Sequence, residues 1–207
     1  MKTLTIIPLI LTVVALLLVQ TVFGNDDKYI AAMQKNIQLV YTADTLPELQ
    51  DAANAFERIA SAEKTKWEPY YYATFAYVMM SNYDKDANKR DQYLDMATVT
   101  IGKAKEIEPN ESEVIAMEGF IYMMRLTIDP GSRGPRYAGL SMQTFEKALA
   151  VNPENPRALA LKAQMEYGTA KFFGSSTESA CVTTRLAVTK FETYRSPNVL
   201  APQWGKK

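Results

Sequence analysis

The sequence predicts an all-α fold, and three observations support this class. Apolar residues recur at the three- and four-residue spacing of amphipathic helices along nearly the whole chain. No segment alternates cleanly between apolar and polar residues, and no Asn-Gly or Asp-Gly pair marks a hairpin turn. The segment from Ala97 to Asn110 recurs 44 residues later, from Ser141 to Glu154. Because such self-similarity is typical of stacked helical units, we expect about four antiparallel helix pairs arranged as a solenoid.

The first half of the chain contains four predicted helices. Apolar residues between positions 29 and 40 have helical spacing and indicate a first helix of about four turns. Thr45 and Glu48 fit a capping box with Pro47 in the first turn, which predicts a second helix running to about Ile59. An aromatic-rich third helix is predicted over residues 67–81, and a fourth follows the polar connector at residues 84–88.

Four more helices are predicted in the second half. Residues 110–113 resemble a capped start for the fifth helix, and the segment 129–136, rich in glycine and proline, predicts a loop after it. A sixth helix runs to about Val151. Asn155 and Pro156 open the seventh helix, and Gly174 ends it. Residues 175–178 fit a capping box for the eighth.

Several of these positions carry the pattern of a known repeat family. Gly119 and Tyr122 lie in the first helix of a pair, Phe145 and Ala148 lie in the second, and Pro153 follows them. This order resembles the tetratricopeptide repeat family, and the chain looks like an exported bacterial member of it. The resemblance implies a right-handed superhelix in which small residues let paired helices approach closely and Phe145 fills the seam.

The repeat length departs from the family pattern. A tetratricopeptide unit has about 34 residues, and a longer period is typical of HEAT-type repeats. The period here is 44 residues, although the order of small and large residues favours the tetratricopeptide interpretation. We expect the additional residues in lengthened connectors within each pair, or in longer helices.

The resemblance also implies a concave face lined by the first helix of each pair. The residues placed there are Tyr72, Ala76, Met79, Ala116, Phe120, Met123, Ala160, Gln164 and Tyr167. An apolar groove with aromatic and methionine walls is suited to a helix or an extended peptide, so the expected partner is a protein or peptide. The alternative is that these residues belong to the core, because apolar helix faces are usually buried.

Charged residues suggest two weaker hypotheses. Arg133 and Arg136 lie in the predicted loop at 129–136 and form a candidate anion-binding site, with a solvated loop as the alternative. Glu118 and Glu166 are candidates for a carboxylate pair with acid–base activity, and salt bridging is the alternative.

Composition excludes several classes of function. The chain has 23 basic and 23 acidic residues, which leaves no electrostatic footprint for nucleic acid. It has no histidine, which removes Ser-His-Asp triads and the usual zinc sites, so we expect no catalytic residues, metal or cofactor. The single cysteine, Cys181, is expected to be buried as a small apolar residue, and a redox or intermolecular role is the alternative.

The two ends of the chain indicate export and capping. Lys2, an apolar stretch at residues 6–19 and small residues before Asn25 predict a signal peptide over residues 1–24, with an uncleaved membrane anchor as the alternative. A helical repeat domain is expected over residues 25–195, and a capping tail over residues 196–207 covers the last helix pair. The alternative for the tail is that Trp204 occupies the concave groove of its own or another molecule.

The predicted function is therefore a non-catalytic, exported scaffold or adaptor that binds a protein or peptide through a helical-repeat groove. The expected location is the periplasm, and membrane contact is expected only if the signal segment is uncleaved. A self-associating structural protein and a carboxylate-based enzyme of the cell envelope are the alternatives.

Overall fold

All regular structure in the described part of the protein is helical. The structure is a computed structural model that describes residues 26–206, so the predicted signal peptide at residues 1–24 lies outside the described residues. The predicted all-α class is confirmed, because the regular structure within residues 26–206 consists of helices and includes no strand.

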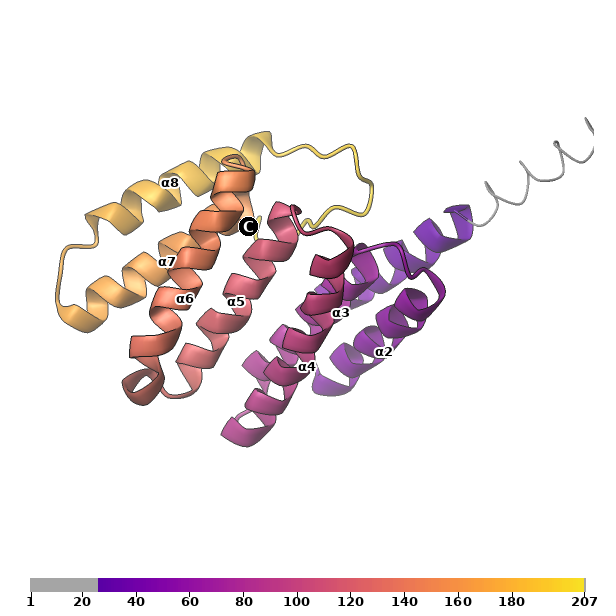
Figure 1. Ribbon diagram of the computed structural model, residues 1–207, viewed down its shortest axis with the longest axis horizontal. Helices are drawn as coiled ribbons and strands as arrows, with labels where there is room; N and C mark the ends of the chain where they lie inside the picture. Colours follow the sequence, from indigo (N-terminus) through magenta and orange to yellow (C-terminus); the bar gives the residue numbers. More distant parts are fainter. Residues whose placement is uncertain (1–25, 207) are drawn as a thin grey trace, which may run out of the picture.

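Eight helices follow one another along the described chain (Figure 1). The first covers residues 26–42. The others are α2 (Leu46–Ala62), α3 (Glu68–Tyr83), α4 (Ala87–Ile107), α5 (Ser112–Ile128), α6 (Pro130–Val151), α7 (Pro156–Phe173) and α8 (Glu178–Thr193). From α2 onward each helix packs against the next, and α5 also contacts both α3 and α7. The stack therefore runs in chain order from the first helices to α8 at the opposite end (Figure 1).

The 44-residue period is built into the helices themselves. Helices α3, α5 and α7 begin at Glu68, Ser112 and Pro156, which are 44 residues apart in turn. The second helices α4 and α6 have 21 and 22 residues, whereas α3, α5 and α7 have 16 to 18. Asp129 alone separates α5 from α6. The expectation of lengthened connectors is therefore wrong, and the alternative of longer helices holds for α4 and α6, which carry the additional residues.

Local capping signals determine several helix ends. The hydroxyl of Thr45 accepts a hydrogen bond from the Glu48 amide, and the Glu48 carboxylate accepts one from the Thr45 amide, so the predicted capping box is confirmed. Asn155 caps α7 through its side chain, and Gly174 ends α7 with a φ of 66° in the left-handed region. The box predicted before α8 is wrong, because Thr177 is the cap and makes no side-chain capping bond.

The segment predicted as a loop at residues 129–136 is instead the start of α6. Asp129 accepts a hydrogen bond from the Ser132 amide, and Pro130 occupies the first turn, where its missing N–H costs nothing. Pro135 lies inside the helix. The capped start therefore outweighs the local preference of these glycines and prolines for a turn.

The core is centred on α3. Its buried residues pack against the first helix, α2, α4 and α5, with Tyr71 and Tyr72 both fully buried. Between α5 and α6, a Cβ placed on Gly119 would lie 2.5 Å from Cε1 of Phe145, whose side chain is fully buried. This contact confirms that a small residue on α5 allows close approach and that Phe145 fills the seam.

Candidate functional site

The residues predicted to form a concave groove do not share one surface. Tyr72, Ala76 and Ala116 are at most 1% exposed, so they are core residues, as the alternative interpretation had it. Met123 is also buried, whereas Met79 and Phe120 are half-buried. The α7 residues Gln164 and Tyr167 are exposed, with Ala160 half-buried beside them. Partner binding through the buried residues of this set is therefore not possible in this structure.

The C-terminal tail, residues 194–206, covers the accessible part of the face on α3 and α5. The Trp204 ring stacks on Phe75 and on Phe120, with ring centroids 5.3 and 5.9 Å apart and interplanar angles of 26° and 25°. Leu200 is 3% exposed and joins the main core. The anchored part of the tail therefore lies over the first helix, α3 and α5, where the expectation that the tail covers the last helix pair is wrong. Of the described tail residues, only Gly205 and Lys206 line the space between α7 and α8.

Polar contacts fix the tail along this face. The Tyr72 hydroxyl donates a 2.7 Å hydrogen bond to the Leu200 carbonyl, and the Gln203 amide donates to the Tyr41 hydroxyl at 3.0 Å. Asn198 donates to Glu68 at 2.9 Å. Burial strongly raises the pKa of Tyr72, so its hydroxyl keeps the proton that it donates to the tail.

Trp204 is also joined to a buried ion pair. Arg157, at the start of α7, donates to both carboxylate oxygens of Glu113 on α5, at 2.7 and 2.8 Å, and the two side chains are 1% and 8% exposed. The Trp204 indole N–H donates to the Tyr71 hydroxyl at 3.0 Å, and that hydroxyl donates to Glu113 at 3.4 Å. Arg157 also lies 3.5 Å from the Trp204 carbonyl. The tail, α3, α5 and α7 therefore share one hydrogen-bonded network.

Sequence reasoning missed the Glu113–Arg157 pair, although one signal for it was present. The two residues are 44 residues apart, so they occupy the same position in successive repeats and carry opposite charges. Burial opposes the charge of Arg157, but its hydrogen bonds to the Glu113 carboxylate raise the Arg157 pKa. The guanidinium therefore stays protonated.

A separate cavity of about 510 Å³ lies between α7 and α8. Helix α7 lines it with Ala160, Ala163, Gln164 and Tyr167, and α8 lines it with Ala180, Cys181, Thr184, Ala187, Val188, Phe191 and Glu192. The spacing of three, four and seven residues places each set on one helix face. Gly205 and Lys206 of the tail complete the lining. The two predicted groove residues of α7 that are exposed therefore belong to this cavity.

The antiparallel register of α7 and α8 gives the cavity two different ends. Glu166 accepts a 2.7 Å hydrogen bond from Thr183, while Glu154, before α7, pairs with Lys190 at 2.6 Å. Tyr167 therefore lies toward the end of the cavity that carries Cys181, and the tail closes the opposite end. Cys181 is exposed, so the expectation that it is buried is wrong.

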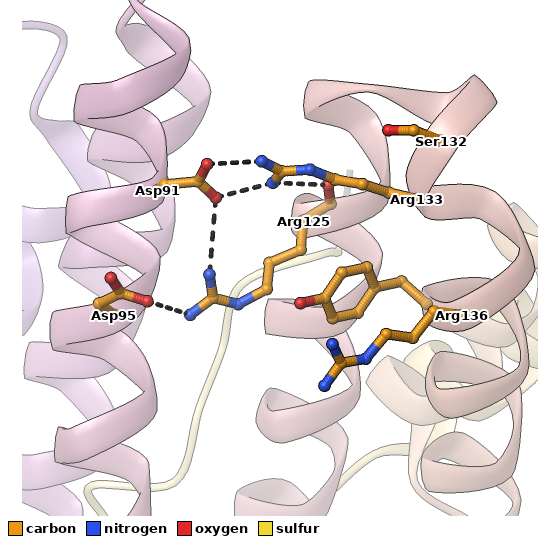
Figure 2. A pocket seen from close by; sticks show the side chains of 7 residues that line it. Asp91, Asp95, Arg125, Ser132, Arg133 and Arg136 are labelled. Carbon is orange, nitrogen blue, oxygen red and sulfur yellow. Dashed lines mark hydrogen bonds and ion pairs between the residues drawn. The ribbon is translucent and has the colours of Figure 1, made fainter.

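The arginines predicted to bind an anion are already engaged by neighbouring side chains. Figure 2 shows Arg133 donating to both oxygens of Asp91, at 2.7 and 2.6 Å, with Arg125 bridging to Asp95 at 2.6 Å. The hydrogen bond from Arg133 lowers the pKa of the Asp91 carboxyl. Figure 2 draws no contact between Arg136 and either carboxylate, and the Arg136 guanidinium lies 5.3 Å from the Tyr137 ring centroid. The predicted two-arginine anion loop is not formed.

The two candidate catalytic carboxylates have separate partners. Glu118 pairs with Lys105 of α4 at 2.8 Å. Glu166 pairs with Lys162 at 2.6 Å and also accepts from α8. Although burial opposes it, these hydrogen bonds lower the pKa of Glu166, so it is not poised as an acid. Salt bridging, the alternative interpretation, is confirmed for both residues.

The described residues lack two further features. Within residues 26–206 there is no group of three or more Cys, Asp or Glu side chains placed to hold a metal ion. No helix in that range is both long enough and apolar enough to cross a membrane.

Comparison with known proteins relates the chain to solved structures of similar fold. No protein-family model matches the sequence, and a search of curated proteins finds no match. The fold is similar to that of the HusA haemophore from Porphyromonas gingivalis, with a TM-score of 0.77 and 25% sequence identity. The similarity covers 86% of this chain and 87% of that chain.

Proposed function

We propose that the protein is an exported, non-catalytic carrier that binds a flat, mostly apolar ligand of the haem class in the cavity between α7 and α8. The observation that carries the proposal is this cavity of about 510 Å³ in a fold similar to that of a haemophore. Cavities of about 300–1,000 Å³ with apolar walls and few polar groups are typical small-molecule sites.

The lining of the cavity fits such a ligand. Four alanines line the cavity, two from each helix: Ala160, Ala163, Ala180 and Ala187. Such small side chains suit a flat ring system between the helices. Haem is held in proteins through its iron by His, Cys, Met or Tyr. The chain has no histidine, so a phenol or thiol is the available iron ligand in the lining.

Tyr167 is the iron ligand that we propose. It is 53% exposed and lines the cavity, which leaves its hydroxyl accessible to a ligand. The ammonium of Lys206, at the opposite end, suits the carboxylates of a haem ligand.

The arrangement of the helices favours a tetratricopeptide-like, right-handed superhelix. Its support is the exact repetition of the starts of α3, α5 and α7 every 44 residues, together with the seam between Gly119 and Phe145. Export, with the periplasm as the location, is proposed from the signal-peptide pattern of residues 1–24.

A protein- or peptide-binding scaffold is the second candidate. Its support is the docked tail, because the face of α3 and α5 holds an extended segment with an aromatic anchor. Self-association is a related possibility, supported by Phe172 and Phe173 at the end of α7, which are 69% and 74% exposed.

Filling the cavity tests the carrier function. Thr184→Trp places a large ring in the cavity from an exposed position on α8, and we expect it to weaken binding of ferric protoporphyrin (hemin) by roughly tenfold or more. Affinity is measured by absorbance titration of the purified protein. Thr189→Trp is the matched control, since Thr189 is exposed on the same helix outside the lining and makes the same type of backbone hydrogen bond as Thr184.

The outcome separates the two candidate functions. Saturable hemin binding that Thr184→Trp weakens and Thr189→Trp preserves supports the carrier. Failure of the unmodified protein to bind hemin would exclude the haem-class ligand. Equal affinity of both variants would place the bound hemin outside this cavity.

Tyr167→Phe tests the proposed iron ligand. We expect a changed absorbance spectrum of bound hemin, because the phenol oxygen is removed while the ring that lines the cavity is kept. Tyr83→Phe is the control, because Tyr83 is 45% exposed and lies outside the cavity. A spectrum that changes only in Cys181→Ser would transfer the role to the thiol.

A further inference from the structure

The C-terminal tail connects the cavity to the interior of the stack. Gly205 and Lys206 are part of the cavity lining, although they follow an extended segment that leaves α8 and crosses α3 and α5. One wall of the cavity therefore depends on where the tail docks, and not only on the packing of α7 against α8.

Gly205 fits its place in this wall closely. Its φ is 90°, in the left-handed region that favours glycine, and a Cβ there would lie 2.9 Å from Cζ of Phe191. Phe191 is itself a lining residue and is 8% exposed. The backbone of Gly205 therefore packs directly against the Phe191 side chain, which lines this end of the cavity.

Trp204, the preceding residue, is what holds Gly205 there. Its ring stacks on Phe75 and on Phe120, and its indole N–H donates a hydrogen bond to the Tyr71 hydroxyl. Residues 195–197, between α8 and the docked part of the tail, are exposed. The tail is therefore anchored on α3 and α5, and an exposed segment joins this anchor to α8.

We propose that Trp204 is a positioning residue for the α7–α8 cavity, and that its docking between α3 and α5 is linked to occupancy of the cavity. This inference rests on the proposed carrier function. When Trp204 is docked, Gly205 and Lys206 complete the cavity and the ligand is retained. When the tail is released, the cavity loses that wall. By thermodynamic reciprocity, a ligand that binds the completed cavity more tightly also stabilises the docked tail.

The test measures this linkage in both directions. We expect Trp204→Ala to weaken hemin binding by about tenfold and to speed hemin release, whereas Trp204→Phe, which keeps a stacked ring, stays within about threefold. In the unmodified protein, hemin should slow hydrogen exchange of the Gln203 amide, which donates to Tyr41 in the docked tail. Val199→Ala is the control, because Val199 belongs to the tail but is 65% exposed.

A second variant keeps the test decisive if Trp204→Ala does not fold. A chain ending at Trp204 retains the anchor and removes the wall residues, and we expect it to remain as stable as the full chain but to bind hemin about tenfold more weakly. A purely structural role of Trp204 would lower the melting temperature without changing hemin affinity.

Each result has a distinct meaning. If folded Trp204→Ala, or the shortened chain in its place, binds hemin like the unmodified protein, the inference is overturned while the carrier function stands. The same holds if hemin leaves exchange of the Gln203 amide unchanged. If the unmodified protein does not bind hemin, the proposed function fails and the inference fails with it.

Discussion

Replacing Glu113 with alanine is expected to lower the free energy of unfolding by about 3–5 kcal/mol, because it breaks a buried ion pair by removing one partner. The substitution removes the carboxylate that accepts two hydrogen bonds from Arg157, whose side chain is 1% exposed. The positive charge then stays buried beside the rings of Tyr194 and Trp204, and ring faces compensate a charge far less than a carboxylate does.

Denaturant titration followed by circular dichroism measures this effect. Glu118→Ala is the matched control, since its pair with Lys105 has side chains that are 24% and 46% exposed and contributes about 0–1 kcal/mol. The double variant Glu113→Leu/Arg157→Met should recover most of the loss, because it leaves no unpaired buried charge. If Glu113→Ala lowers the free energy of unfolding no more than Glu118→Ala does, the Glu113–Arg157 pair does not hold α5 and α7 together.

Features set by neighbouring residues were predictable from the sequence. The caps at Thr45 and Asn155 and the glycine end at Gly174 depend on residues within one helical turn. Helical spacing of apolar residues, with the polar breaks between such segments, predicted the number and order of the helices.

Features set by distant contacts were not predictable. Arg133 was assigned to a loop, but it bonds to Asp91 across 42 residues, and this contact supports a helix start that glycines and proline would disfavour locally. The tail bonds to Tyr72 and Tyr41 across 128 and 162 residues. No local pattern encodes such a contact. The sequence therefore allowed two positions for Trp204, over the last helix pair or in the groove, and offered no way to decide between them.

The candidate cavity was predictable only in part. Gln164 and Tyr167 were assigned to a binding surface, and they do line the cavity. Their partners on α8 were missed because its faint apolar pattern gave no reason to prefer one face. Cys181 was expected to be buried because free cysteines usually are, but it lies exposed on the face of α8 toward the cavity.

Gly119→Val is expected to lower the free energy of unfolding by about 2–3 kcal/mol, because it overpacks the seam between α5 and α6. Even the first added carbon would lie 2.5 Å from Phe145, and that ring cannot move aside. It is fully buried among Met123, Leu161 and Met165. Replacing a glycine inside a helix by valine stabilises the helix by only a few tenths of a kcal/mol, so the strain outweighs this gain.

Gly102 provides a matched control for this prediction. It lies inside α4 with no atom within 4 Å of an added Cβ, so Gly102→Val should be neutral or slightly stabilising. The double variant Gly119→Val/Phe145→Leu should lose less stability than the sum of its single variants, because the smaller side chain accommodates the added methyls. Additive losses of stability in the double variant would mean that Gly119 and Phe145 are not in contact. Equal losses for Gly119→Val and Gly102→Val would mean that the close approach of α5 to α6 is not a constraint on this fold.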